Sequence, residues 1–180
     1  RFTVIGVGGC GCKIAEQLHW TNLGGDVDYC AVNADMQALN ECGLANKFAL
    51  GSRLTGGLGT GGDPERGRAA ALEDMEEIET ICKGADIVFV LAGLGGGTGT
   101  GAAPLIAVAA KKLGALVLPF VSLPFDCEGD RRSEQATLGI RELQKTSDGV
   151  IYLPNKKLVK LLNPDTSPLP ASKTVPAQHL

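Results

Sequence analysis

The sequence lacks the residue patterns that mark a metal-binding or disulfide-stabilised protein. Six cysteines are spread along 180 residues without a Cys-x-x-Cys pair, and the two histidines, His19 and His179, have no partner at metal-ligand spacing. We therefore expect reduced, mostly buried thiols in a cytoplasmic protein.

Long hydrophobic runs and concentrated positive charge are missing as well. The longest apolar stretch, 114–125, is interrupted by Pro119 and Pro124 and falls short of the ~18 residues that a membrane-spanning helix needs. The net charge is -3, and the basic residues occur as scattered pairs without a basic face. These absences predict no direct membrane insertion and no nucleic-acid partner.

Glycine, in contrast, is abundant. The chain holds 25 glycines, a share about twice the ~7% of average usage. They gather in three clusters, at 6–11, 51–62 and 93–101. Because glycine costs conformational entropy on folding, such clusters indicate places where bare backbone is needed.

Short β-branched runs alternate with helical patterns along the chain. The runs 2–7, 29–33, 87–92, 116–121 and 150–153 predict buried strands, with 47–50 as a weaker sixth. Helical patterns fall between them at 10–23, 63–83, 100–113 and 130–145. This alternation is typical of an α/β fold with three layers, in which a doubly wound, mainly parallel six-stranded sheet carries helices on both faces.

The pattern at 63–83 predicts one long helix, the clearest of the chain. Asp63 can cap it and Pro64 suits its first position. Its apolar residues recur every three to four positions, at Leu72, Met75, Ile78 and Cys82.

The last residues of the chain have a different character. Four prolines and no periodic apolar face occur between Asn163 and Leu180, which predicts an irregular tail or linker. We therefore divide the sequence into one domain over 1–162 and a proline-rich tail over 163–180.

The first glycine cluster follows a strand and precedes a helix. Gly6, Gly8 and Gly11 match the G-x-G-x-x-G pattern of dinucleotide-binding folds, and Asp28 or Asp35 follows at about the 20-residue spacing of a ribose-binding acid. A nicotinamide or flavin oxidoreductase is therefore one interpretation. The pattern alone is weak, because any tight strand-to-helix turn can collect glycines for packing.

A second glycine stretch, G-G-G-T-G-T-G at 95–101, shifts the interpretation. It follows another buried strand, so a parallel sheet would bring both stretches to one crevice at its carboxyl edge. Backbone N–H groups, the helix beginning near Thr100 and the hydroxyls of Thr98 and Thr100 would hold an anion there. Because no Walker-type lysine occurs, we expect a polyphosphate held by backbone groups, the helix dipole and magnesium.

These motifs resemble those of the FtsZ/tubulin family of cytoskeletal GTPases, most closely bacterial and archaeal FtsZ. The matching segments are V-N-A-D-M-Q-A-L at 32–39, L-T-G-G-L-G-T-G-G-D-P-E at 54–65, G-A-D-I-V-F-V-L-A-G-L-G-G-G-T-G-T-G-A-A-P at 84–104, P-F-D-C-E-G-D-R-R at 124–132 and L-P-N at 153–155. The resemblance extends from 2 to about 162. It implies a Rossmann-like GTP-binding domain from a GTPase that assembles head to tail into filaments and is linked to cell division.

The resemblance also implies which residues hold the nucleotide. Phosphate contacts fall to Gly8, Gly9 and Cys10, to Gly95, Gly96, Gly97, Thr98, Gly99, Thr100 and Gly101, and, near the γ-phosphate, to Asn33, Thr60, Gly61 and Gly62. Asp35 lies near the magnesium, indirectly. Pro124, Glu128 and Arg132 match positions around the ribose, and Asn155 one that reads the guanine edge. Lys13 also matches a nucleotide-contacting position.

Several positions depart from the family pattern. Lys13 stands where FtsZ usually has an asparagine, which removes a hydrogen-bond acceptor, adds a charge and bears on guanine selectivity. Asp63 replaces an asparagine and Asp130 an arginine. The family's central helix, its acidic N-x-D-x-x-D loop and its C-terminal domain do not follow residue 162. The resemblance therefore implies no catalytic residue within this chain, and GTP binding with poor hydrolysis.

Three functions follow from these observations. The first is the GTP-binding domain of a polymerising GTPase, with GTP or GDP and magnesium as ligands and copies of itself as partners. The second is a nucleotide-binding scaffold or regulator without turnover. The third is an NAD-dependent oxidoreductase, which would explain the first glycine cluster alone. We favour the first.

Overall fold

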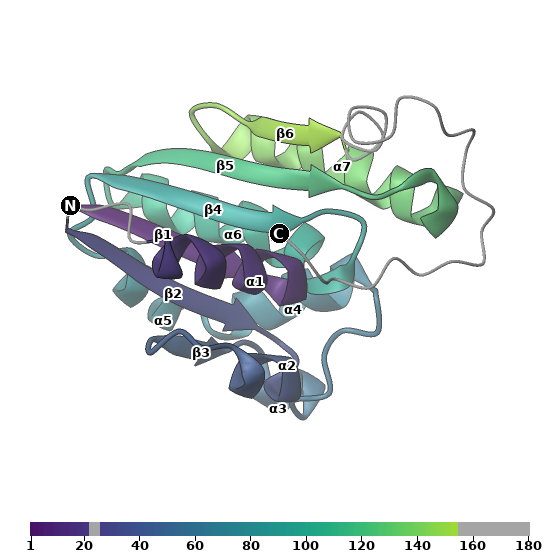
Figure 1. Ribbon diagram of the computed structural model, residues 1–180, viewed down its shortest axis with the longest axis horizontal. Coiled ribbons are helices and arrows are strands. Elements are labelled where there is room, and N and C mark those ends of the chain that lie inside the picture. The colour runs from purple at the N-terminus through teal and green to yellow at the C-terminus, as the bar shows by residue number, and fades with distance from the viewer. Residues whose placement is uncertain (22–25, 155–180) are drawn as a thin grey trace.

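A sheet of six parallel strands forms the centre of the molecule (Figure 1). The computed structural model describes residues 1–21 and 26–154. The strands are β1 (Phe2–Val7), β2 (Val27–Asn33), β3 (Lys47–Ala49), β4 (Ile87–Gly93), β5 (Leu116–Leu123) and β6 (Ile151–Pro154), in the order β3-β2-β1-β4-β5-β6. Every pair is parallel, as predicted. The order reverses direction between β1 and β4, the place where doubly wound sheets open a ligand crevice.

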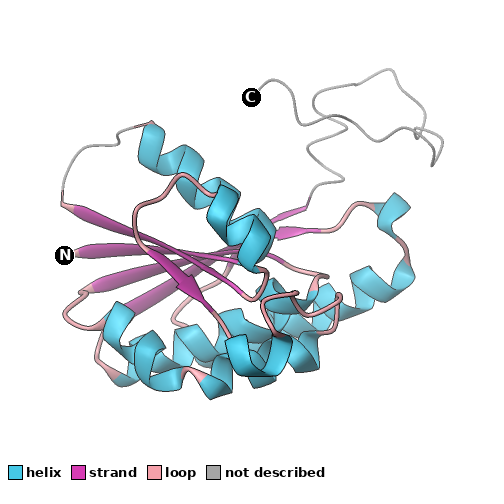
Figure 2. Ribbon diagram, turned by 90° about the horizontal axis from the view of Figure 1, so that it is seen from below, coloured by secondary structure: helices cyan, strands magenta, loops and turns pink. Residues whose placement is uncertain are grey.

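Helices pack against both faces of this sheet (Figure 2). They are α1 (Gly8–Trp20), α2 (Met36–Glu41), α3 (Ser52–Thr55), α4 (Pro64–Glu73), α5 (Met75–Cys82), α6 (Gly97–Lys112) and α7 (Asp130–Thr146), with a 3-10 helix, η1 (Asp126–Glu128). α1 lies on one side of the sheet, and α4, α5 and α6 lie on the other. The α/β class with three layers is thereby confirmed.

The core divides into two clusters because successive strand residues point to opposite faces. Val4 and Leu91 belong to the cluster under α1, whereas Ile5, Val7 and Val90 belong to the cluster under α6. All five are buried. The continuous apolar runs in the sequence therefore reflect a sheet covered on both faces.

α1 leaves part of its own face of the sheet open. An apolar groove of about 560 Å³ runs beside it, with Ile14 and Leu18 of α1 on one side and Phe89 and Phe120 on the sheet. In the part of the chain that the structure describes, no helix is long and apolar enough to cross a membrane.

The prediction of one helix over 63–83 is wrong in one respect, because the helix is broken at Asp74 into α4 and α5. This residue lies between α4 and α5 with φ -115° and ψ 34°, and its side chain accepts a hydrogen bond from the Gly51 N–H. The predicted N-terminus is confirmed, because Asp63 accepts from the Glu65 N–H at 2.9 Å. Leu72, expected on the buried stripe, is 54% exposed, since α4 and α5 bury separate faces.

The sequence predicted loops at the glycine stretches, but these residues form the first turns of helices. α1 begins at Gly8 and α6 at Gly97, two and three residues before the predicted starts. The low helix propensity of glycine predicted no helix at these residues, but close tertiary packing overrides this propensity. The short helices α2, α3 and η1 were not predicted.

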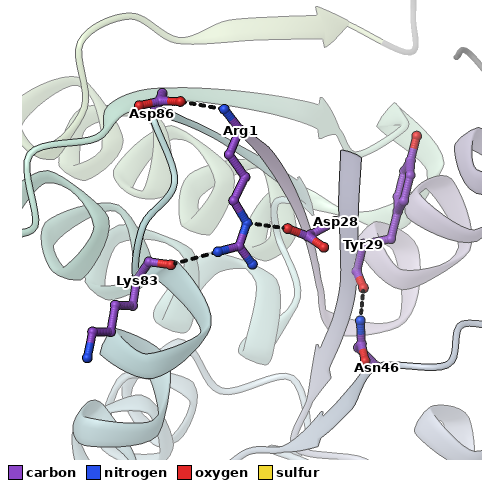
Figure 3. Close-up of polar contacts among 6 residues, drawn as sticks. All are labelled: Arg1, Asp28, Tyr29, Asn46, Lys83 and Asp86. Carbon is purple, nitrogen blue, oxygen red and sulfur yellow. Dashed lines mark hydrogen bonds and ion pairs between the residues drawn. The ribbon is translucent and has the colours of Figure 1, made fainter. Parts of the chain in front are cut away.

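Polar contacts of Arg1 tie three elements together at the amino edge of the sheet (Figure 3). Its Nε lies 2.5 Å from Asp28 Oδ2, its Nη1 donates to the Lys83 carbonyl at 3.4 Å, and its amino group pairs with Asp86. Asp28 pairs in register with Thr3, near the start of β1. It lies at the edge opposite the crevice, so Asp28 is wrong as a ribose-binding acid.

All six cysteines are free thiols. Burial raises the pKa of Cys12 and Cys82 to about 12 and that of Cys30 to about 11, because the apolar surroundings disfavour the thiolate. Cys42 is buried as well, whereas Cys10 and Cys127 are exposed.

Candidate functional site

A cavity of about 640 Å³ opens at the carboxyl edge of the sheet, over the reversal between β1 and β4. It is lined by the ends of β1, β2, β4 and β5, by the loop between α3 and α4, and by the chain around η1. Fifteen of the residues singled out from the sequence line it: Gly8, Gly9, Cys10, Asn33, Asp35, Thr60, Gly61, Gly62, Gly96, Gly97, Thr98, Gly99, Pro124, Glu128 and Arg132. Both glycine stretches therefore meet at one crevice, as predicted.

Four other candidates do not line the cavity. Lys13 is exposed on α1, and Gly95 and Gly101 are packed against neighbouring segments. Thr100 is 5% exposed, and its Oγ1 accepts a hydrogen bond from the Gly95 N–H at 2.9 Å. Thr100 therefore closes the turn before α6 instead of facing the cavity. A fifth candidate, Asn155, and the tail over 163–180 lie outside the described residues.

The two helices that begin at the cavity have no side-chain N-cap. α1 follows Val7 and α6 follows Gly96, and neither N-cap makes a side-chain hydrogen bond. Neither first turn contains an acidic residue. Because the first N–H groups of a helix lack partners within it, two sets of donors and two positive helix ends converge on this cavity.

Several glycines of the two stretches are required by packing alone. A Cβ built on Gly11 would stand 2.0 Å from the Leu91 carbonyl oxygen, and one on Gly99 would stand 2.4 Å from that of Gly93. A Cβ on Gly97 would meet Thr60 Oγ1 at 2.0 Å. These glycines let α1 and α6 approach the strands and the 59–63 loop closely.

Four cavity-lining glycines have no such neighbours. A Cβ on Gly9, Gly61, Gly62 or Gly96 would meet nothing within 4 Å. Gly61 and Gly62 have φ of 62° and 78°, which favours glycine on conformational grounds. Gly9 and Gly96 have no positive φ, so neither packing nor backbone geometry in the described residues requires glycine there. Close approach of a ligand to the backbone would require it.

Asn33 and Asp35 follow β2 at the cavity wall. Asn33 is 3% exposed, and its Oδ1 accepts from the Asp35 N–H at 3.3 Å. Asp35 Oδ1 accepts from the Ala38 N–H at 3.0 Å and so caps α2. Both side chains are therefore held in place before any ligand is bound.

Glu128 and Arg132 form the opposite wall and contact each other. Arg132 Nη1 lies 2.5 Å from Glu128 Oε2, and Glu128 Oε1 accepts from the Phe125 N–H at 2.8 Å. Both side chains keep part of their surface exposed, 54% for Arg132 and 29% for Glu128. Glu128 ends η1 and Arg132 lies in the first turn of α7, so their ion pair joins the two helices.

Sequence reasoning missed some lining residues because only tertiary structure places them here. Ser122, at the end of β5, has its Oγ 3.5 Å from Cys10 Sγ. Leu58 lines the cavity and is 88% exposed. Phe125 also lines it. The cavity thus combines many backbone donors with a few apolar surfaces, which suits a ligand with both phosphates and a flat ring system.

The described residues contain no group of three or more His, Cys, Asp or Glu side chains that could hold a metal ion. A magnesium ion would therefore have to rely on ligand oxygens and water, which is its usual manner of binding beside phosphates.

This geometry is that of a doubly wound α/β domain with a cavity at which two helix N-termini meet. A model of the Tubulin/FtsZ family, GTPase domain, matches residues 1–163, and the chain belongs to this family. The oxidoreductase interpretation is thereby replaced.

Relatives of known name support the same assignment. The chain is 45% identical over 171 residues to cell division protein FtsZ of Buchnera aphidicola subsp. Baizongia pistaciae, covering 95% of this chain and 44% of that protein. It is 46% identical over 168 residues to cell division protein FtsZ of Pseudomonas aeruginosa, and the match covers 93% of this chain and 42% of that protein. The chain thus spans less than half the length of these relatives.

Solved structures agree in fold. The empty FtsZ dimer of M. jannaschii superposes with a TM-score of 0.88 at 40% identity, covering 93% of this chain and 48% of that one. GDP-bound CetZ1 from Haloferax volcanii superposes with a TM-score of 0.81 at 26% identity, and the match covers 86% of this chain and 51% of that one.

Proposed function

We propose that these residues bind GTP and GDP in the cavity at the carboxyl edge of the sheet. The observation that carries the proposal is the convergence of two uncapped helix N-termini on a cavity lined by Gly9 and Gly96. Backbone N–H groups there suit the α- and β-phosphates. The run 59–62 forms the wall that we assign to the γ-phosphate.

The remaining candidates divide between the sugar and the base. Pro124, Glu128 and Arg132 would surround the ribose, with the carboxylate accepting from a hydroxyl and the guanidinium facing phosphate charge. Asn155 would read the guanine edge. Lys13, at the exposed side of α1, would change guanine selectivity relative to relatives with asparagine there.

We propose magnesium as the accompanying ion. Asp35 would hold the ion through a water molecule and not directly. Its Oδ1 already caps α2, so Oδ2 is the oxygen that would accept from this water. When bound, magnesium would neutralise phosphate charge, and the protein would contribute Asp35 as an outer partner.

We expect the 180-residue chain to hydrolyse GTP poorly. The carboxylates that line the cavity in the described residues are Asp35 and Glu128. Asp35 caps α2 through Oδ1, and we assign its Oδ2 to a water of the magnesium ion. Both oxygens of Glu128 are engaged, one by the Phe125 N–H and the other by Arg132. A general base needs an acceptor directed at the proton that it removes. In a protein of the relatives' full length, the base would come from a neighbouring copy stacked head to tail. Turnover would then accompany assembly into a cytoplasmic filament.

Isothermal titration of the 180-residue chain with GTP, GDP and NAD, in the presence of magnesium, tests the binding proposal. We expect guanine nucleotides to bind and NAD to bind far more weakly. Tighter binding of NAD than of GTP would overturn the proposal.

Phosphate release measured against protein concentration tests the hydrolysis proposal separately. We expect a rate that stays low at every concentration. A rate that rises steeply with concentration in this chain would show that its own carboxylates complete the site. If a protein of the relatives' full length that contains this domain also binds GTP without turnover, the scaffold interpretation replaces the GTPase.

A further inference from the structure

The break between α4 and α5 directs two acidic side chains at the start of α3. The Gly51 N–H donates to Asp74 Oδ2 at 2.5 Å, and the Arg53 N–H donates to Glu73 Oε1 at 3.0 Å. Asp74 is the N-cap of α5 but makes no capping hydrogen bond to that helix. Its carboxylate serves a segment 23 residues earlier in the chain instead.

Gly51 is fixed from two sides. Its φ of 60° and ψ of 43° lie in the left-handed region, and a Cβ built on it would stand 2.3 Å from Ala70 Cβ. The backbone therefore touches α4 at this point. The Asp74 hydrogen bond sets where the following helix begins.

A series of hydrogen bonds continues from Gly51 to the cavity wall. Thr55 Oγ1 donates to the Gly51 carbonyl at 2.9 Å and accepts from the Gly57 N–H at 3.2 Å. The Gly57 carbonyl then accepts from the Met36 N–H at 2.9 Å, and the Gly59 N–H donates to the Ala34 carbonyl at 3.1 Å.

Residues 59–62 come directly after this series and line the cavity. Five glycines between 56 and 62 have positive φ, so this stretch has little side-chain packing of its own to hold it. Thr60 is buried beside Gly97, and the position of the glycines around it depends on the contacts at the ends of the stretch.

We propose that Asp74 is a positioning residue for the wall formed by 59–62, acting through Gly51, α3 and Thr55. Asp74 does not line the cavity and touches no ligand. The proposal rests on the proposed function, which assigns this wall to the γ-phosphate. Loss of the Asp74 carboxylate should therefore weaken binding of GTP more than binding of GDP.

The test compares Asp74→Ala and Asp74→Asn in the 180-residue chain by titration with GTPγS and GDP. We expect Asp74→Ala to lose about tenfold in GTPγS affinity, which corresponds to about 1.4 kcal/mol, with little change for GDP. Asp74→Asn keeps an oxygen acceptor for the Gly51 N–H and should restore the ratio of the two affinities. If Asp74→Ala does not fold, Asp74→Glu, which misplaces the acceptor by one methylene, carries the same comparison.

Asp148→Ala is the matched control. Asp148 Oδ2 accepts from the Val117 N–H at 2.9 Å, which is the same kind of backbone contact at the start of β5, and its Oδ1 lies 2.8 Å from Lys111 Nζ. Asp148 does not line the cavity. This variant should lose stability without changing the GTPγS-to-GDP affinity ratio. An equal change of the ratio in both variants would reduce Asp74 to a general stability role and overturn the proposal.

Amide hydrogen exchange without nucleotide separates this proposal from the proposed function. Asp74→Ala should speed exchange at Gly57 and Gly59, whose N–H groups are hydrogen-bonded in the series above, and Asp148→Ala should not. Unchanged exchange at both amides overturns the positioning role even if GTP binds. Failure of the parent chain to bind GTP, with faster exchange in Asp74→Ala, overturns the proposed function alone.

Discussion

The carbonyl oxygen of Leu91 lies so close to Gly11 that a Cβ on Gly11 would stand 2.0 Å from it. Gly9, two residues earlier in the same helix, has nothing within 4 Å of such a Cβ. Packing thus requires glycine at position 11 but not at position 9, and we propose that close approach of the ligand requires it there.

Gly11→Ala should therefore destabilise the fold, whereas Gly9→Ala should not. Overpacking of this kind costs about 1–3 kcal/mol or more, because the contacted atom is backbone of β4. Gly9→Ala should unfold in urea like the parent but bind GTP more weakly. Equal stability of the two variants would contradict the packing argument.

The second glycine stretch allows the same comparison. Gly96→Ala should keep the stability of the parent and lose nucleotide affinity, since Gly96 lines the cavity in an extended conformation open to a side chain. Gly97→Ala should unfold more readily, because its Cβ would meet Thr60 Oγ1 and the backbone of Asp63. Urea unfolding and titration with GDP give the two readouts, and full GDP affinity in Gly96→Ala would show that no ligand approaches the backbone there.

Thr98→Val should weaken nucleotide binding by roughly 1.5–3 kcal/mol, the usual contribution of a hydrogen bond to a charged group. Thr98 lines the cavity and is 8% exposed, and valine keeps its volume while removing the hydroxyl. Thr137→Val, on the exposed side of α7, is the control. If folded Thr98→Val binds GTP like the parent, the hydroxyl has a structural role.

Thiol labelling should distinguish the six cysteines. Near pH 8, Cys10 and Cys127 should react, whereas Cys12 and Cys82 should not, since burial raises their pKa to about 12 and keeps them as thiols. GTP should protect Cys10, which lines the cavity, and leave Cys127 reactive. Mass spectrometry of the labelled peptides measures both effects, and labelling of Cys10 at the same rate with and without GTP would argue against a nucleotide in contact with α1.

The same buried thiols should make the fold sensitive to alkali. The pKa of Cys82 is about 12 in the folded state and 9.0 in its ordinary range. Above pH 9 the Cys82 thiol loses its proton more readily in the unfolded chain than in the folded one. The free energy of unfolding is therefore unaffected by this thiol below pH 9 and declines as the pH rises towards 12. Urea unfolding at a series of pH values should show a smaller decline for Cys82→Ala than for the parent, and parallel curves would contradict this.

Local signals in the sequence were sufficient to predict β1 and the start of α4. β1 occupies the predicted residues, because a short β-branched run bounded by glycine has few alternatives, and Asp63 caps α4 as expected. The break at Asp74 could not be predicted, because its cause is a hydrogen bond to Gly51, distant in sequence. The start of α6 at Gly97 could not be predicted for a similar reason, since Gly97 packs closely against Thr60 and Asp63, which are distant in sequence.

In the candidate site too, features set by local sequence could be predicted, whereas features set by contacts between distant residues could not. Backbone donors at the glycine stretches could be predicted from composition and from their place after buried strands. The contact between Cys10 and Ser122 could not, since it requires β5 to lie beside β4. Thr100 was expected to face the ligand, but its hydroxyl closes the preceding turn onto Gly95, a choice that residue type alone does not reveal.

Within residues 1–21 and 26–154, the outer strands of the sheet are its shortest, three residues in β3 and four in β6. Short edge strands offer few free backbone groups on which another chain could extend the sheet. Copies of this domain are thereby discouraged from joining edge to edge into a continuous β-structure. Ordered self-association would then be left to the loops at the two ends of the strands, so that the polarity of the parallel sheet would set the polarity of any polymer built from it.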